Sequence, residues 1–211
     1  MHVFFPSNFV YWNKVKNHEK IKEKYYTEIL KNKNTISKNQ NWVAEVVTSY
    51  NNSDWNKIFF NREFCDNVIW PYFDNMLEKL SDNIPIPEES YLSECWVNLY
   101  EKGNFQEPHQ HGKPFNKIDG RYHSNVFCGI YLLHLEEKNK TVFFQDTSSS
   151  CGNTDSKFNF MTDFIEEGNV IFFPSTLLHY VLPSEKERCT ISFNLTSVYN
   201  PSETFYPKIY Q

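Results

Sequence analysis

The chain has 211 residues, which is enough for one domain with a sizeable core, and 18% of them are aromatic. A net charge of −5 and a pI near 5.8 argue against a generally basic surface for nucleic acid. No apolar run approaches the length that crosses a bilayer, and the N-terminus lacks the basic and long apolar segments of a secretory signal.

Cysteine usage indicates a reducing compartment. The cysteines are odd in number, widely spaced and without a Cys-x-x-Cys pair, so they suit free thiols better than a disulfide frame or a zinc knuckle. We therefore expect a cytoplasmic protein. The five cysteines are Cys65, Cys95, Cys128, Cys151 and Cys189.

The first predicted element is an amphipathic helix within Asn13–Lys38. Ile21, Tyr25 and Ile29 recur every four residues and form one apolar stripe. The same segment is rich in lysine, but glutamates interrupt the run. We interpret the lysines as a solvated helix face rather than a nucleic-acid patch.

A strand and a long helix are predicted next. Trp42–Ser49 has the composition of a strand, and Ser53 and Asp54 can cap a helix that runs from about Trp55 toward Leu80. Pro71 lies inside that helix and is expected to kink or split it, because proline removes a backbone hydrogen bond.

From Tyr91 onward the apolar period changes to two, which indicates strands separated by turn residues. Helices followed by many short strands predict an α+β fold: a double-sheet barrel with the N-terminal helices packed on one outer face. The predicted strands are Glu94–Tyr100, Asn125–His134, Thr141–Gln145, Phe158–Met161, Asn169–Phe173, Leu177–Leu182 and Arg188–Tyr199.

Three histidines are candidate metal ligands. His109 and His111 are two residues apart, so on an extended segment they point the same way, and His179 can arrive on a neighbouring strand. Neutral imidazoles suit iron, and three ligands on one side of a metal leave positions open for other molecules. A His-x-His pair between Pro108 and Gly112 is by itself more often a pair of surface loop residues.

Arg188, nine residues after His179, favours the interpretation of the histidines as metal ligands over that as surface loop residues. On a strand, Arg188, Thr190 and Ser192 share one face, whereas the other face is apolar. An arginine that points into a barrel needs an anion, and its guanidinium can bind a carboxylate through two parallel hydrogen bonds. The alternative is pairing with a structural carboxylate or exposure at the barrel rim.

The sequence resembles the iron(II)- and 2-oxoglutarate-dependent oxygenases, and within them the putative 2OG-Fe(II) oxygenases common in marine bacteria and their phages. The resemblance covers most of residues 91–194. Four segments carry it: CWVNLYEKGNFQEPHQH at 95–111, GIYLL at 129–133, GNVIFFPS at 168–175, and the stretch from His179 to Asn194.

The resemblance implies a single oxygenase domain over 1–211, with 1–90 as mainly helical support and 91–211 as a double-stranded β-helix (jelly-roll, cupin-like) core. It implies that His109 and His179 bind the metal, that Arg188 holds the far carboxylate of 2-oxoglutarate, and that Ser192 supplies a hydroxyl nearby. The implied cofactors are Fe(II), 2-oxoglutarate and dioxygen.

The third ligand departs from the family's His-x-Asp/Glu motif, because His111 stands at the carboxylate position. Three outcomes follow: a three-histidine site, a carboxylate from elsewhere, or an inactive site. Asp119, Asp146 and Glu107 are carboxylates near enough in sequence to consider, and we rank them below His111.

Two further departures concern the pocket wall and its entrance. Many relatives have two tyrosines in the GIYLL strand, the second of which contacts 2-oxoglutarate; here Tyr131 is followed by leucine. Tyr131, Tyr100 and Asn98 are therefore all candidate cosubstrate contacts, whereas Trp96 is expected to fill the core. The segment 112–124 is predicted to form a loop over the mouth, where specificity often resides.

The sequence thus predicts a dioxygenase that hydroxylates a protein side chain, such as prolyl, or a small metabolite, with release of succinate and CO2. The alternatives are a catalytically inactive cupin-like metal-binding module and a three-histidine dioxygenase that does not use 2-oxoglutarate. We expect a protein or small-molecule substrate and rank a nucleobase last, because the chain is acidic. We expect no membrane partner, and a homodimer is left open.

Overall fold

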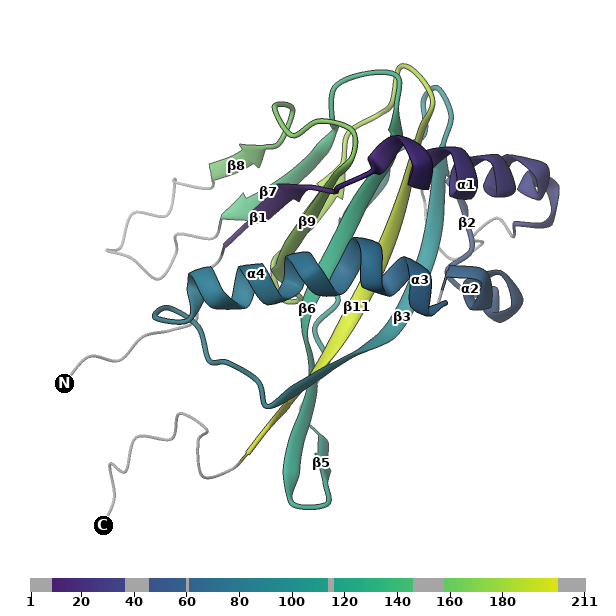
Figure 1. The fold of residues 1–211 in the computed structure, drawn as a ribbon. Coiled ribbons are helices and arrows are strands. Elements are labelled where there is room, and N and C mark those ends of the chain that lie inside the picture. Colours follow the sequence, from purple (N-terminus) through teal and green to yellow (C-terminus); the bar gives the residue numbers. More distant parts are fainter. Residues whose placement is uncertain (1–8, 37–45, 60, 114–115, 146–157, 201–211) are drawn as a thin grey trace, which may run out of the picture.

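The computed structural model describes residues 9–36, 46–59, 61–113, 116–145 and 158–200, and two antiparallel sheets organise this part of the chain (Figure 1). The larger sheet has the order β1-β9-β6-β11-β3-β2, with β5 paired to β6, and the smaller has the order β4-β10-β7-β8. The strands are β1 (Tyr11–Lys14), β2 (Val47–Thr48), β3 (Glu89–Tyr100), β4 (Gln106–His109), β5 (Asn116–Ile118), β6 (Arg121–Leu135), β7 (Thr141–Gln145), β8 (Phe158–Met161), β9 (Asn169–Pro174), β10 (His179–Val181) and β11 (Arg188–Tyr199).

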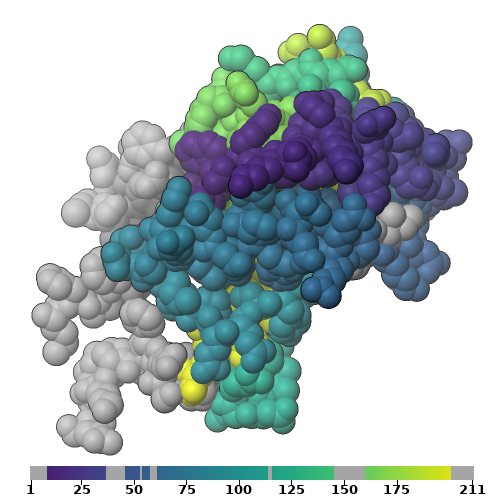
Figure 2. All heavy atoms as spheres, viewed as in Figure 1, coloured from purple at the N-terminus to yellow at the C-terminus, as the bar shows by residue number. Residues whose placement is uncertain are grey.

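The helices precede most of these strands in the chain and lie on one face of the larger sheet, where α1 and α4 cross its strands (Figures 1 and 2). They pack there through a large apolar cluster, and a second apolar cluster lies between the two sheets. This is the jelly-roll arrangement predicted from the sequence, with helices on one outer face. The helices are α1 (His18–Lys31), η1 (Lys33–Thr35), α2 (Ser53–Phe59), α3 (Arg62–Phe64), the π-helical η2 (Cys65–Ile69) and α4 (Trp70–Leu80).

The predicted stripe of α1 is confirmed, since Ile21, Tyr25 and Ile29 are all buried against the sheet. The helix begins later than expected. Tyr11–Lys14 is strand β1 instead, paired with β9 at the edge of the larger sheet. The expected strand over 42–49 is described only from residue 46, and β2 occupies two of those residues.

The long helix predicted from Trp55 to Leu80 is not one helix. A separate helix, α3, starts after Asn61, whose side chain accepts a hydrogen bond from the backbone N–H of Phe64 and so caps α3. An irregularity was expected near Pro71, and the structure has one just before it, the π-helical turn η2. Pro71 itself lies at the start of α4, where the backbone N–H that proline lacks would have no partner within the helix. The cap of α2 is Asn52 rather than the predicted serine or aspartate.

Most predicted strands are confirmed to within a few residues, but β4 and β5 were missed. β4 contains Pro108, which argues against a strand interior. It is tolerated because β4 is an edge strand that pairs only with β10. β5 forms a hairpin with β6 through Asp119 and Gly120, both at positive φ, so the expected loop over 112–124 is largely a β-ribbon.

Gly129 shows how tightly the larger sheet packs under the helices. A Cβ there would lie 2.2 Å from the ring of Phe193 on the neighbouring strand β11, so only glycine leaves room for the ring. The four cysteines within the described residues are free and buried, as expected, and Cys151 lies outside them.

None of the helices in the described part has the length and hydropathy needed to cross a membrane. The cytoplasmic location stays a prediction.

Candidate active site

The three candidate histidines converge at one end of the space between the sheets. β10 lies between β4 and β7, which places His179 directly opposite His109. His111 follows β4, and its backbone N–H donates to the carbonyl of Ser175, which holds it beside the other two. The ring centroids are 4.3 to 5.2 Å apart, and one ligand nitrogen of each ring lies within 4.8 Å of the others.

Backbone hydrogen bonds orient two of these rings. Nδ1 of His109 lies 2.8 Å from the carbonyl oxygen of Glu107, and Nδ1 of His179 lies 2.9 Å from that of Leu177. A ring that donates from Nδ1 carries its lone pair on Nε2, so these carbonyls set the tautomer that binds metals.

Burial keeps the three rings neutral. It lowers the pKa of His109, lowers that of His111 to about 3, and takes that of His179 well below its ordinary value, because a charged imidazole would lose its hydration. The neighbouring imidazoles lower the pKa of His111 and His179 further. Neutral imidazoles at neutral pH are what a metal site requires.

Arg188 lies in the same cavity without an anionic partner. Its side chain is 1% exposed, it stacks on the ring of Tyr100 at 4.8 Å, and Nη2 donates to Oγ1 of Thr141 at 3.4 Å. Nε and Nη1 have no hydrogen-bond acceptor, and none of the described carboxylates forms an ion pair with the guanidinium. Burial lowers the pKa of Arg188. A buried cation in this state is costly until an anion joins it.

Tyr100 forms the wall beside this arginine. Its hydroxyl donates to Oε1 of Gln106 at 2.9 Å, and burial raises its pKa to about 12, so the phenol stays neutral. The cavity lies between the two sheets. The described residues that line it include Trp96, Tyr100, Gln106, His109, His111, Cys128, Thr141, His179, Arg188, Thr190, Ser192 and Asn194.

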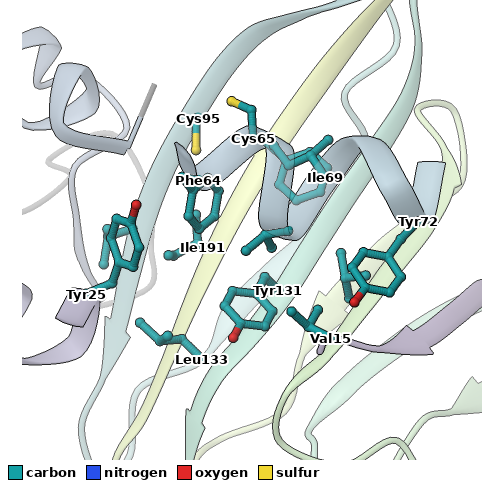
Figure 3. Packing of buried hydrophobic residues seen from close by; sticks show 14 of the residues in the cluster. Val15, Tyr25, Phe64, Cys65, Ile69, Tyr72, Cys95, Tyr131, Leu133 and Ile191 are labelled. Carbon is teal, nitrogen blue, oxygen red and sulfur yellow. The ribbon is translucent and has the colours of Figure 1, made fainter. Parts of the chain in front are cut away.

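The structure therefore brings most of the predicted residues together, with two exceptions. Tyr131 points to the other face of the sheet, where it lies among the residues that pack against the helices (Figure 3), and its hydroxyl is 2.7 Å from Nδ1 of His18. This contradicts its expected place in the cosubstrate pocket. Asn98 is buried beside the cavity and bonded to Thr48 and Ser192, but it does not line the cavity.

Of the alternative carboxylates, the two that the structure describes, Glu107 and Asp119, do not join the histidines. Asp119 lies in the turn between β5 and β6, and Asp146 lies outside the described residues. Within the described residues, the only metal-binding group that includes the candidate histidines consists of the three histidines themselves.

Gln106, Thr141 and Asn194 also line the cavity and were not predicted as site residues. Asn194 had a signal, because it continues the alternation of Arg188 and Ser192 on β11. Gln106 precedes a proline on an edge strand, and Thr141 starts a short strand, so neither had a pattern of its own.

Comparison with known proteins finds a family that this chain resembles. A model of the family described as "Putative 2OG-Fe(II) oxygenase" matches residues 94–194, just under half of the chain. Over that region the chain is similar to the 2OG-Fe(II) oxygenases, and the cofactors of that family are Fe(II), 2-oxoglutarate and dioxygen. No curated protein sequence matches the chain.

Solved structures of other proteins share the fold of this chain at low sequence identity. A Pseudomonas putida prolyl-4-hydroxylase is 13% identical with a TM-score of 0.55, over 92% of this chain and 94% of that one. A Trichoplax adhaerens prolyl hydroxylase in complex with a hypoxia inducible factor peptide is 14% identical with a TM-score of 0.53, over 93% and 86%. The carbocyclase SnoK from nogalamycin biosynthesis is 11% identical with a TM-score of 0.59, over 94% and 84%.

The chemistry of the cavity fits both iron and 2-oxoglutarate. Three neutral imidazoles offer nitrogen ligands that suit iron. The orphaned guanidinium of Arg188 fits a carboxylate, and 2-oxoglutarate carries one at each end. The donor set and the buried cation share one cavity, so a single molecule can contact both.

Proposed function

We propose that this oxygenase hydroxylates a C–H bond of a protein side chain or a small metabolite, with conversion of 2-oxoglutarate to succinate and CO2. The observation that carries the proposal is the buried, unpaired Arg188 in the same cavity as three converging neutral histidines. We also propose that residues 1–211 act as one domain, in which the helices support the sheet that carries Arg188.

In this proposal His109, His111 and His179 hold the iron. The carbonyls of Glu107 and Leu177 fix the rings of the first and third, as described above. His111 replaces the carboxylate of the usual motif, so the protein contributes no negative charge among its three ligands. The bound iron would supply the oxidising chemistry that no amino-acid side chain can provide.

Arg188 and its neighbours hold the cosubstrate. The guanidinium binds the far carboxylate through two parallel hydrogen bonds, and stacking on Tyr100 fixes its plane. Ser192 lies on the same strand face, where its hydroxyl can contact the cosubstrate. The neutral phenol of Tyr100, held by Gln106, closes the wall beside the guanidinium. Asn98 supports this wall from behind through Ser192.

We favour a side chain presented by a peptide as the substrate, because one of the structural neighbours is a prolyl hydroxylase in complex with a peptide fragment. Prolyl hydroxylases occur among the structural neighbours, so prolyl is the first side chain to test.

The test is succinate release. The purified protein with Fe(II), ascorbate and 2-oxoglutarate should form succinate slowly alone and faster with a proline-containing peptide library. Iron binding without any succinate would favour the inactive cupin-like module. Substrate oxidation without consumption of 2-oxoglutarate would favour a three-histidine dioxygenase of another kind, which would leave Arg188 without an anion.

Two variants separate the roles. Arg188→Ala should weaken 2-oxoglutarate binding by at least about thirtyfold, as for loss of one partner of a buried charge pair, while iron affinity changes little. Unchanged affinity for 2-oxoglutarate would exclude the proposed role of the arginine. Arg121→Ala, which removes an exposed arginine paired with Glu89, is the matched control and should bind as the wild type does.

A further inference from the structure

A second side chain of the cavity, that of Trp96, has a hydrogen-bond donor without an acceptor. Among the described residues that line the cavity, Trp96 and Arg188 alone have buried side-chain nitrogens without a partner. The orphaned atom of Trp96 is the indole Nε1, which can only donate. The sequence predicted this residue to be a simple core filler, and such a filler would leave the N–H unexplained.

The indole ring is held rigidly next to the histidines. Trp96 is 2% exposed and stacks on the ring of His111, with the centroids 5.5 Å apart and the planes 27° from parallel. The ring of Tyr50 meets it edge-on at 5.0 Å. Packing from these two rings fixes the plane of the indole, so its N–H has a fixed direction.

Another tryptophan of the chain shows the ordinary arrangement. Trp55 is also buried, and its Nε1 donates to Oγ1 of Thr35 at 2.9 Å. A buried indole N–H normally finds such an acceptor, and leaving it without one costs more than the hydrogen bond contributes when made. The acceptor of Trp96 is therefore expected to enter the cavity with a ligand.

We propose that Trp96 donates a hydrogen bond from Nε1 to the oxo-acid end of 2-oxoglutarate; this rests on the proposed function. Both orphaned donors line one cavity: Arg188 stacks on Tyr100, and Trp96 stacks on His111, one of the three candidate metal ligands. Trp96 and Tyr100 lie on the same face of β3. A dicarboxylate has two acceptor groups, so a single ligand can offer one to each donor.

The experiment compares Trp96→Phe with Trp55→Phe in calorimetric titrations of the iron-loaded, oxygen-free protein. Phenylalanine keeps an aromatic ring and removes only the N–H. Two probes are used: 2-oxoglutarate, and 2-oxobutyrate, which keeps the oxo-acid end and lacks the far carboxylate. Trp96→Phe should weaken both probes about tenfold. Trp55→Phe should bind both as the wild type does, and Arg188→Ala should weaken 2-oxoglutarate alone.

Three outcomes would overturn the assignment of Trp96. These are unchanged affinity of Trp96→Phe for both probes, weakening of 2-oxoglutarate alone, and an equal loss of iron affinity, which would mean that the ring acts only by packing on His111. If the wild type did not bind 2-oxoglutarate, the proposed function itself would be wrong. Failure of the Trp96 assignment can therefore be distinguished from failure of the proposed function.

Discussion

The two faces of the larger sheet use their polar groups in opposite ways. On the helix face, the hydroxyl of Tyr131 is bonded to His18, and Glu167 accepts from Lys22 and from the backbone of Leu135. On the cavity face, Arg188 and Trp96 are equally buried and have donors without acceptors. The same strands supply both faces, so we attribute the difference to function: we propose that the donors of Arg188 and Trp96 gain their acceptors when a ligand enters the cavity.

The largest effect is expected on the cavity face. His179→Ala removes the most deeply buried of the three rings and should abolish stoichiometric iron binding, since two ligands remain. Iron content after anaerobic loading measures this. His134→Ala, on the helix face beside Glu167, is the control and should retain iron. Full iron content in His179→Ala would exclude the histidine cluster as the metal site.

On the helix face, the largest expected effect is on folding. Gly129→Ala places a methyl group against the ring of Phe193 and should destabilise the protein by roughly 1–3 kcal/mol, the usual cost of overpacking a core. Urea unfolding measures it. Adding Phe193→Leu should recover part of the loss, because the smaller side chain leaves room for the methyl. A Gly129→Ala protein as stable as the wild type would contradict the close contact.

Acid should lower the stability of the metal-free protein through the buried histidine His111 of the cavity face. The pKa of His111 is lowered to about 3 in the folded protein from an ordinary 6.5, so below about pH 6.5 the unfolded chain binds more protons than the folded one. Stability of the metal-free protein should therefore fall between pH 7 and 5, where carboxylates remain ionised. Unfolding curves across this range should show a shallower fall for His111→Asn. Identical pH profiles for the two proteins would count against the buried neutral ring.

The smallest effect is predicted for Tyr131→Phe. It removes the hydrogen bond to His18 and should cost about 1 kcal/mol of stability, while 2-oxoglutarate affinity stays unchanged. Paired unfolding and calorimetric measurements separate the two. A clear loss of 2-oxoglutarate affinity would mean that the helix face and the cavity are not independent.

The contrast between the faces also explains what could be predicted from the sequence. β11 alternates polar and apolar residues, so the inward direction of Arg188 followed from its period. β6 is apolar on both faces between Phe127 and Leu133, and such a strand gives no sign of which side is inward. Tyr131 was therefore assigned by resemblance alone, and the structure shows it on the other side.

The other misses have local causes. β4 escaped prediction because Pro108 is acceptable only on an edge strand, and edge position is a property of the whole sheet. The β5–β6 hairpin did have a signal, because Asp119 and Gly120 are a favoured pair for a tight turn. The N–H of Trp96 without an acceptor had no signal in the sequence, since the lack of an acceptor is visible only in three dimensions.

The central claim is that the cavity face is incomplete without an anion, and the thermal stability of Arg188→Met tests it most directly. Without ligand, this variant should melt at or above the temperature of the wild type, because it no longer buries an unpaired cation. Saturating 2-oxoglutarate with a non-oxidising metal should raise the midpoint of the wild type by about 5 °C or more and leave the variant unchanged. A variant that melts far lower than the wild type, yet gains as much from 2-oxoglutarate, would contradict the account.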